Sequence, residues 1–373
     1  MVAAAAGGRS NMLKIIREER FLGIGAATSL VFLLFGDWLH RDYSNLLYLT
    51  LVLTWLFSTV LGSVLAVVRH ADHLAERLGQ PYGTLILTLS VTAVEAMSIS
   101  AVMLHGANNP TLVRDTLMAV IMIILNGMVG VSLLVGGWRH REQQYNLQGA
   151  NAYLSVIIPL AVLGLVLPNM THTTLGPTLS AAQETFLALM SVGLFCAFLA
   201  IQTGRHRGFF VLEAEAVPHQ ASGGPLLKHA VLLVAYMVPV VFLAEQLATP
   251  VDYVIETLNA PVALGGLAIA LLVATPEAIS ATKAAFHNQL QRSMNIFLGS
   301  VLSTIGLTIP VMLVVSHLTG HPITLGVQNG DLVMLLLTLF ISAITFASGR
   351  TNILQGLVHG LLFLAYILLI FEG

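Results

Sequence analysis

The sequence predicts an all-α polytopic membrane protein with eleven transmembrane helices. Of its 373 residues, 56% are hydrophobic and 9% are charged, whereas soluble domains carry about 25% charged residues. Continuously apolar stretches recur along the chain, and each is close to the roughly 20 residues that a spanning helix needs. They lack the alternation of apolar and polar residues that marks a transmembrane β-strand. We therefore expect helices surrounded by membrane lipid.

Hydropathy and the turn and charge signals between apolar runs divide the chain into eleven spans. The expected spans are approximately 21–39, 46–68, 83–106, 111–137, 150–168, 182–203, 227–248, 261–286, 292–318, 330–347 and 353–372. The start, MVAAAAGGRSNMLKIIREER, is interpreted as a cytosolic tail, because its apolar stretch follows charged residues and runs into a full-length span.

The placement of Lys and Arg predicts the orientation. Only Arg41 and Arg114 fall on one side of the predicted membrane, and the other fourteen basic residues fall on the side of the N-terminal tail. Those fourteen are Arg9, Lys14, Arg17, Arg20, Arg69, Arg77, Arg139, Arg141, Arg205, Arg207, Lys228, Lys283, Arg292 and Arg350. Since basic residues gather in the cytosol, we expect a cytosolic N-terminus and, after eleven spans, an external C-terminus. The expected location is the plasma (inner) membrane of a prokaryote.

Two acids lie well inside predicted spans. Glu95 stands in LSVTAVEAMSIS and is the only formal charge between Pro81 and His105, and Glu277 stands in LVATPEAISATKAAF. A charge at the centre of a spanning helix costs about 2.5 to 3.5 kcal/mol on insertion scales. An intramembrane Glu can be structural, as a hydrogen-bond partner of a neighbouring helix, but two in matching sequence contexts favour a functional site.

The contexts of these acids indicate an internal repeat. Arg114 precedes Asn126 by twelve residues, and Arg292 precedes Thr304 by twelve. Five spans surround each acid, and an odd number gives the two halves opposite orientations. This is the inverted-repeat plan of secondary transporters.

The repeat gives the expected division of the chain. Residues 1–45 hold the cytosolic tail and an extra first helix, 46–203 the first five-helix repeat, 204–226 a cytosolic linker, and 227–373 the second five-helix repeat.

The pseudo-two-fold relation predicts that Glu95 and Glu277 meet at the repeat interface. Two bare carboxylates repel each other strongly where water is scarce, so at least one must hold a proton unless a cation takes its place. Such a pair is a proton/cation exchange site. Its hard oxygen ligands suit Na⁺, Ca²⁺ or Mg²⁺ rather than a soft transition metal.

Further oxygen ligands are expected, because Ca²⁺ takes six to eight oxygens and two carboxylates supply at most four. The polar candidates are Thr92, Asn126, Thr275, Ser300 and Thr304. The alternative for each hydroxyl is a bond to its own helix backbone. Pro276 is expected to kink or break its helix and free a carbonyl, which the membrane tolerates where it lines a cavity.

Several polar residues outside the spans are interpreted as solvated. His70, His73, His140 and His206 could sense cytosolic pH, but exposed surface histidines are the simpler interpretation. Glu213 and Glu215, in the segment LEAEAVPH between the repeats, could attract a cation or belong to a solvated linker.

Three stretches resemble the calcium/cation antiporter superfamily, specifically its ChaA-type sodium/calcium–proton antiporters. They are HADHLAERLGQPYGTLILTLSVTAVEAM, NGMVGVSLLVGGWRHREQQYNLQGANAYLSVIIPLAVLGLVLPN and TPEAISATKAAFHNQLQRSMNIFLGSVLSTIGLTIP. The resemblance implies an eleven-span antiporter in which Glu95 and Glu277 are the central cation and proton ligands. It also implies that Asn126 and Thr304 hold the polar positions of the following spans, with Ser300 one turn before Thr304.

The two halves depart from the superfamily pattern in different ways. The residue three before the acid is Thr92 in the first half and Ala274 in the second, and Met122 stands where Ser300 stands in the other half. We expect an asymmetric site, and the preference among Ca²⁺, Na⁺ and K⁺ stays open.

The leading hypothesis is a proton-coupled cation antiporter that exports Ca²⁺ and/or Na⁺ by alternating access. The alternative is a cation channel that uses the same glutamates as a selectivity element. An enzyme is not expected, nor a cofactor beyond the transported ions, nor a nucleic-acid partner, since no basic tail is present. The chain has no phosphate-binding loop of an ATP-driven pump. Its oligomeric state stays open.

Overall fold

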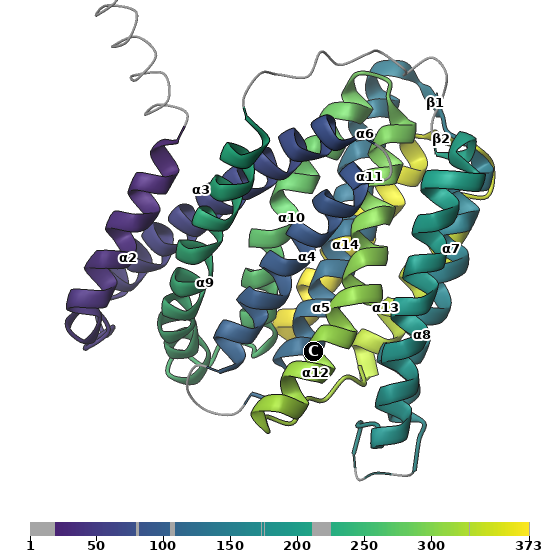
Figure 1. The fold of residues 1–373 in the computed structure, drawn as a ribbon. Coiled ribbons are helices and arrows are strands. Elements are labelled where there is room, and N and C mark those ends of the chain that lie inside the picture. Colours follow the sequence, from purple (N-terminus) through teal and green to yellow (C-terminus); the bar gives the residue numbers. More distant parts are fainter. Residues whose placement is uncertain are drawn as a thin grey trace, which may run out of the picture.

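A computed structural model describes residues 19–79, 82–104, 109–172, 174, 176–210, 225–327 and 329–372. Figure 1 shows a bundle of long helices with one small two-stranded ribbon. The first half comprises α2 (Arg20–Leu39), α3 (Leu46–Leu78), α4 (Tyr82–Met103), α5 (Leu112–Met122), η1 (Ile123–Met128), α6 (Val129–His140), β1 (Glu142–Gln144), α7 (Leu147–Ala161), η2 (Val162–Val166), η3 (Leu167–Asn169), α8 (Ala181–Ala200), η4 (Ile201–Arg205) and η5 (Arg207–Phe209). The second half comprises α9 (Leu226–Glu256), α10 (Ala263–Phe286), α11 (Leu290–Ser303), η7 (Thr304–Thr308), α12 (Ile309–Thr319), α13 (Asn329–Thr345), β2 (Arg350–Asn352) and α14 (Ile353–Glu372).

The predicted all-α membrane architecture is confirmed. Over the described ranges, ten helical stretches are long and apolar enough to cross a membrane, and the apolar part of α13, Gly330–Thr345, is a shorter eleventh. Two of the long helices extend beyond their predicted ends. α3 continues from the expected 68 to Leu78, and α9 continues from 248 to Glu256 through Pro250. A hydropathy criterion stops at the first charges, whereas the helix continues because its last turns still pack against neighbours.

Polar residues in the connecting loops determine where several helices begin. Asn45 and Asn146 accept hydrogen bonds from the first free backbone N–H groups of α3 and α7. Ser180 and Gln183 form a reciprocal capping box at the start of α8. These caps satisfy helix ends that would otherwise leave polar backbone groups unpaired.

The core consists of two hydrophobic clusters. The smaller joins α2, α3 and α9, and the larger joins the remaining helices around α5, α11 and the π-helical segments η1 and η7. Figure 1 shows α2, α3 and α9 side by side at one edge of the molecule. α4 and α10 lie between the two groups, because both contact α9 and also contact the larger cluster.

The helix order agrees with two repeats, α3 to α8 and α9 to α14. The two first helices, α3 and α9, are 33 and 31 residues long and pack against each other. α4 begins at the end of the bundle where α3 finishes, whereas α10 begins at the opposite end, where α9 finishes. The two acid-bearing helices are therefore antiparallel, as an inverted repeat requires.

The middle helices of the two repeats share a local irregularity. Asn126 lies in the π-helical segment η1 and Thr304 begins the π-helical segment η7. π-Helical turns frequently occur at functional sites because they redirect side chains and loosen the regular hydrogen-bond ladder. By contrast, α10 is continuous through Pro276, so of the expected kink or break the break does not occur. The proline still removes the N–H that would pair with the Leu272 carbonyl.

The expectation of a solvated His70 is also wrong. His70 is 1% exposed and lies on α3, with its imidazole between Glu19 and His229. Glu213, Glu215 and the basic residues Arg9, Lys14 and Arg17 lie outside the described residues, as does most of the expected linker 204–226.

Candidate functional site

Glu95 lies in the interior of the bundle, near the middle of α4. Its side chain is 1% exposed. One carboxylate oxygen, Oε2, accepts hydrogen bonds from the hydroxyls of Thr304 at 3.0 Å and Thr308 at 3.1 Å. The other oxygen, Oε1, is buried and has no hydrogen-bond partner among the described residues. Leaving a charged oxygen buried and unpaired is costly, so this atom is suited to bind a proton or a cation.

Glu277 has a similar but more open environment on α10. Its Oε1 accepts a hydrogen bond from the Ser300 hydroxyl at 3.1 Å. Its Oε2 is shielded from solvent and is likewise unpaired within the part of the chain that the structure describes. Each acid therefore offers one engaged oxygen and one vacant oxygen.

A stripe of hydroxyls brings the two acids to neighbouring positions. Ser300, Thr304 and Thr308 follow one another at intervals of four residues along α11 and η7. Helical residues four apart face the same side, with Cβ atoms about 5 to 6 Å apart. Because Ser300 binds Glu277 and Thr304 binds Glu95, the carboxylates occupy adjacent turns of the same helix face. The predicted meeting of the two halves occurs on this stripe.

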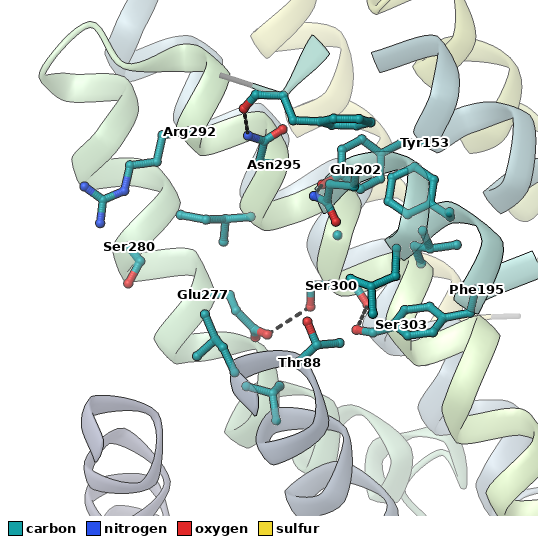
Figure 2. A pocket seen from close by; sticks show the side chains of 18 of the residues that line it. Thr88, Tyr153, Phe195, Gln202, Glu277, Ser280, Arg292, Asn295, Ser300 and Ser303 are labelled. Atoms are coloured by element: carbon teal, nitrogen blue, oxygen red, sulfur yellow. Dashed lines mark hydrogen bonds between the residues drawn. The ribbon is translucent and has the colours of Figure 1, made fainter. Parts of the chain in front are cut away.

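A cavity of about 440 Å³ reaches one of the two acids. Figure 2 shows Glu277, Ser300 and Thr88 at one end of this cavity, and Arg292 and Asn295 toward the other. Arg292 lies in the first turn of α11 and Glu277 near the middle of α10. The cavity thus extends from the centre of the bundle to a helix end. Glu95 is not among its lining residues, so the acids differ in access.

The other predicted ligands occupy three different environments. Thr92 is 5% exposed, and its hydroxyl has no partner in the described structure. Asn126 is fully buried and engaged elsewhere, since it donates to Thr338 at 2.8 Å and its Oδ1 lies 3.3 Å from His359 Nδ1. Thr275 donates to the Leu271 carbonyl of its own helix. Ser300 and Thr304 therefore contact the acids directly, whereas Asn126 and Thr275 make no hydrogen bond to either acid in the described structure.

Comparison with known proteins identifies the family. The family described as "Sodium/calcium exchanger protein" matches residues 22–204 and 228–372. The chain belongs to this family. The two matched segments cover both predicted repeats and leave out the segment between them, and the predicted resemblance is confirmed.

This member of the exchanger family is similar in sequence to a known transporter and similar in fold to two solved structures. The "Sodium-potassium/proton antiporter ChaA" of Escherichia coli (strain K12) is 41% identical over 319 residues, which cover 84% of this chain and 86% of that protein. The structure of native YfkE aligns with a TM-score of 0.74 at 19% identity, over 95% of this chain and 100% of that one. The H⁺/Ca²⁺ exchanger CAX aligns with a TM-score of 0.66 at 14% identity, over 94% and 88%. The structural likenesses support the exchanger fold.

One residue at the site, Thr308, is not among the ligands predicted from the sequence. Thr308 donates directly to Glu95 and is fully buried. Hydroxyl residues recur every four positions at Ser300, Thr304 and Thr308, and this spacing is a signal that could have identified Thr308. The corresponding stripe in the first half of this exchanger reads Met122, Asn126 and Gly130, so the hydroxyl donors come from the second half alone.

Proposed function

We propose that this protein is a proton-coupled cation antiporter that exports Ca²⁺, Na⁺ or both from the cytosol, with K⁺ as a further candidate cargo. The fold and the family support this activity. The Escherichia coli relative is a sodium-potassium/proton antiporter by name. In this proposal the protein lies in the plasma membrane, with its N-terminus in the cytosol and its C-terminus outside.

The pair Glu95 and Glu277 is the observation that carries the proposal. Each acid keeps a vacant carboxylate oxygen in the bundle interior, and both bind the same hydroxyl stripe. Two carboxylates in this setting can hold protons or a cation, but they repel each other when both are bare. Proton and cation binding then exclude one another, and this exclusion couples the two fluxes.

The remaining ligands are proposed to come from uncharged oxygens. In the described ranges no cluster of three or more His, Cys, Asp or Glu residues is suited to hold a metal ion. Thr92, Ser300 and Thr304 can supply hydroxyl oxygens, and the Leu272 carbonyl is released by Pro276. Asn126 and Thr275 would have to leave their present partners to join the site.

The wide cavity supports a transport cycle that begins on the arginine-rich side. Arg207 and Arg292 line the cavity, and the distribution of basic residues assigns this side to the cytosol. A cation entering from the cytosol meets Glu277 first and displaces its proton. Movement of the group α2, α3 and α9 against the larger cluster then closes this route and opens the opposite one. External protons return to the acids and release the cation.

The test is dissipation of a proton gradient in everted membrane vesicles, followed with a pH-sensitive fluorescent dye. Addition of Ca²⁺, Na⁺ and K⁺ in turn, across a series of pH values, should identify the cargo by saturable recovery of fluorescence. Vesicles without the protein provide the baseline. Absence of recovery with every cation, in vesicles shown to contain folded protein, would refute the antiporter proposal.

The same preparation separates the antiporter from a cation channel. An antiporter moves cations only as it moves protons in the other direction, whereas a channel conducts cations without a pH gradient. The family match and the relatives described above are exchangers and antiporters, and they give the channel alternative no support.

A further inference from the structure

We propose that Asp72 and Asp252 are the cation-recruiting carboxylates of the two access routes to the paired glutamates. Asp72 serves the face on which the wide cavity opens, and Asp252 serves the opposite face. This inference rests on the proposed antiport function and adds an entry position on each side of the membrane. Neither residue contacts the transported ion at the central site in this proposal.

Asp72 shares the wide cavity with Glu277 and with two arginines. The charged residues lining the cavity are Asp72, Glu277, Arg207 and Arg292. Asp72 is exposed on α3, whereas Glu277 lies deep and carries the central site. With Glu277 protonated, as at the start of the proposed cycle, Asp72 offsets one of the two arginines, and without Asp72 both arginines would repel an entering cation unopposed. Asp72 is thus the group that keeps the route permissive for cations.

A second, much smaller cavity of about 40 Å³ lies on the other side of the site. It is lined by α4, α5, α9 and α10, and Asp252 of α9 is the acid among its lining residues. The wide cavity is lined by α3, α4, α10 and α11, and also by α7, α8, η4 and η5. Exchanging the two repeats converts α3, α4, α10 and α11 into α9, α10, α4 and α5, so the small cavity corresponds to this part of the wide cavity on the opposite access route.

The two aspartates hold equivalent positions in the repeats. From Leu46 to Asp72, and from Leu226 to Asp252, the separation is 26 residues in each case, counted from the first residue of α3 and of α9. One acid therefore lies at each route, on the same helix of each half. Neither aspartate was singled out in the sequence, because both lie beyond the apolar part of their helices.

Arg114 and Arg292 hold equivalent positions in the two repeats, but their positive charges have different acidic neighbours. Arg114 contacts Asp115, the next residue in the chain, at 2.8 Å. In the second half the residue after Arg292 is Ser293. The arginine at the open route thus lacks an acid next to it in the sequence, and Asp72 lines the same cavity. This difference explains why the open route depends on Asp72.

The test uses purified protein in proteoliposomes of known orientation, with cation-driven proton movement as the readout. Asp72→Asn should raise the cytosolic-face KM for the cation and leave the maximal rate unchanged. A unit charge about 8 Å from the ion's path through water changes the local concentration of a monovalent ion about 2-fold and that of a divalent ion about 5-fold. The shift should therefore be larger for Ca²⁺ than for Na⁺, and it should shrink at high ionic strength.

Matched variants make the test specific. Arg292→Gln should lower the same KM, and Asp72→Glu should retain the wild-type value. Asp252→Asn should raise only the KM measured from the external face. Glu142→Gln, an exposed acid paired with Arg350 on the cytosolic-side ribbon, removes a charge outside the cavity and should change neither value.

An unchanged KM in Asp72→Asn at low ionic strength would overturn the recruiting role while the wild-type antiport persists. Equal effects of Asp72→Asn from both faces, or a lower maximal rate with unchanged KM, would overturn it as well. If the wild-type protein itself moves no protons in response to any cation, the proposed function fails, and the recruiting role fails with it.

Discussion

Two groups of shielded acids in this molecule are stabilised in opposite ways. The Glu19 carboxylate, at the start of α2, accepts hydrogen bonds from Arg69 at 2.7 Å and from Tyr236 at 2.9 Å, and lies 3.2 Å from His70. Within the part of the chain that the structure describes, Glu95 and Glu277 accept hydrogen bonds from the hydroxyls of other side chains alone, and each keeps a vacant oxygen. Glu19 is therefore paired with cationic side chains, whereas the described partners of Glu95 and Glu277 are uncharged. A built-in partner suits structure, whereas its absence leaves the charge to be balanced by protons or transported ions.

The largest effects are expected when each acid is neutralised separately. Glu95→Gln and Glu277→Gln should reduce cation-driven proton movement by at least about 100-fold, because removing the carboxylate partner of a buried cation typically costs about 3 kcal/mol or more. Glu19→Gln is the control and should keep the rate within about 2-fold. Vesicle assays at matched protein levels provide the measurement, and full activity in either site variant would refute the assignment.

Removing the hydroxyl donors should have an intermediate effect. Thr304→Val keeps the side-chain shape and deletes a donor to Glu95. Hydrogen bonds to charged groups contribute about 1.5 to 3 kcal/mol, so the cation KM should rise about 10-fold or more. The proton should be held more tightly, and the working range should therefore move to higher pH. Ser300→Ala should act in the same direction through Glu277. A KM that stays constant at every pH would remove the hydroxyl stripe from the site.

The Glu19 cluster should affect stability rather than transport. Burial raises the pKa of Glu19, but the Tyr236 hydroxyl, the Arg69 guanidinium and His70 together outweigh burial and place this pKa below its ordinary value. The ionised acid therefore stabilises the folded state above the unfolded-state pKa of about 4.5, and this contribution is lost as the pH falls through the folded-state pKa.

Thermal unfolding in detergent at several pH values checks this expectation. Wild-type protein should lose stability on acidification more steeply than Glu19→Gln. Since the Arg69 side chain is 38% exposed, solvent screens the pair, and the contribution at neutral pH should be about 1 kcal/mol or less. Parallel curves for the two proteins would show that Glu19 is not linked to folding.

The smallest effect is expected at Thr275. Its hydroxyl bonds the carbonyl of Leu271 within the same helix, so Thr275→Val should leave the cation KM within about 2-fold of wild type and stability within about 0.5 kcal/mol. Measured beside Thr304→Val, it distinguishes a hydroxyl at the acids from one that only bonds its own helix. A large rise in KM would show that Thr275 turns into the site during the cycle.

Features that depend on composition and repetition could be predicted from the sequence. The apolar runs identify the spans, and the matched surroundings of Glu95 and Glu277 identify the acids and the inverted halves. The internal repeat predicts equivalent positions for Asn126 and Thr304, and both residues lie in π-helical segments. The fold prediction is confirmed because a bilayer imposes strict requirements on length and charge, whereas the roles of the two acids stay a prediction.

Features that depend on packing between distant segments could not be predicted. His70 is buried because α3 continues past its apolar part and packs against α9, which a hydropathy criterion does not detect. The partners of Asn126, Thr338 and His359, come from α13 and α14, far along the chain. The sequence also does not indicate that the cavity reaches Glu277 and leaves Glu95 enclosed. Access to each acid depends on the conformation of the protein, whereas the repeat places the two acids in equivalent sequence positions.

Proton release on cation binding is the decisive measurement for competition between protons and cations at Glu95 and Glu277. Purified protein in weakly buffered detergent solution is titrated with Ca²⁺ or Na⁺, while the pH of the solution and the bound cation are both followed. If protons and cations compete for the paired carboxylates, binding should release protons from wild-type protein, and neither release nor binding should persist in Glu95→Gln/Glu277→Gln. Cation binding at full affinity with no release of protons would contradict the account.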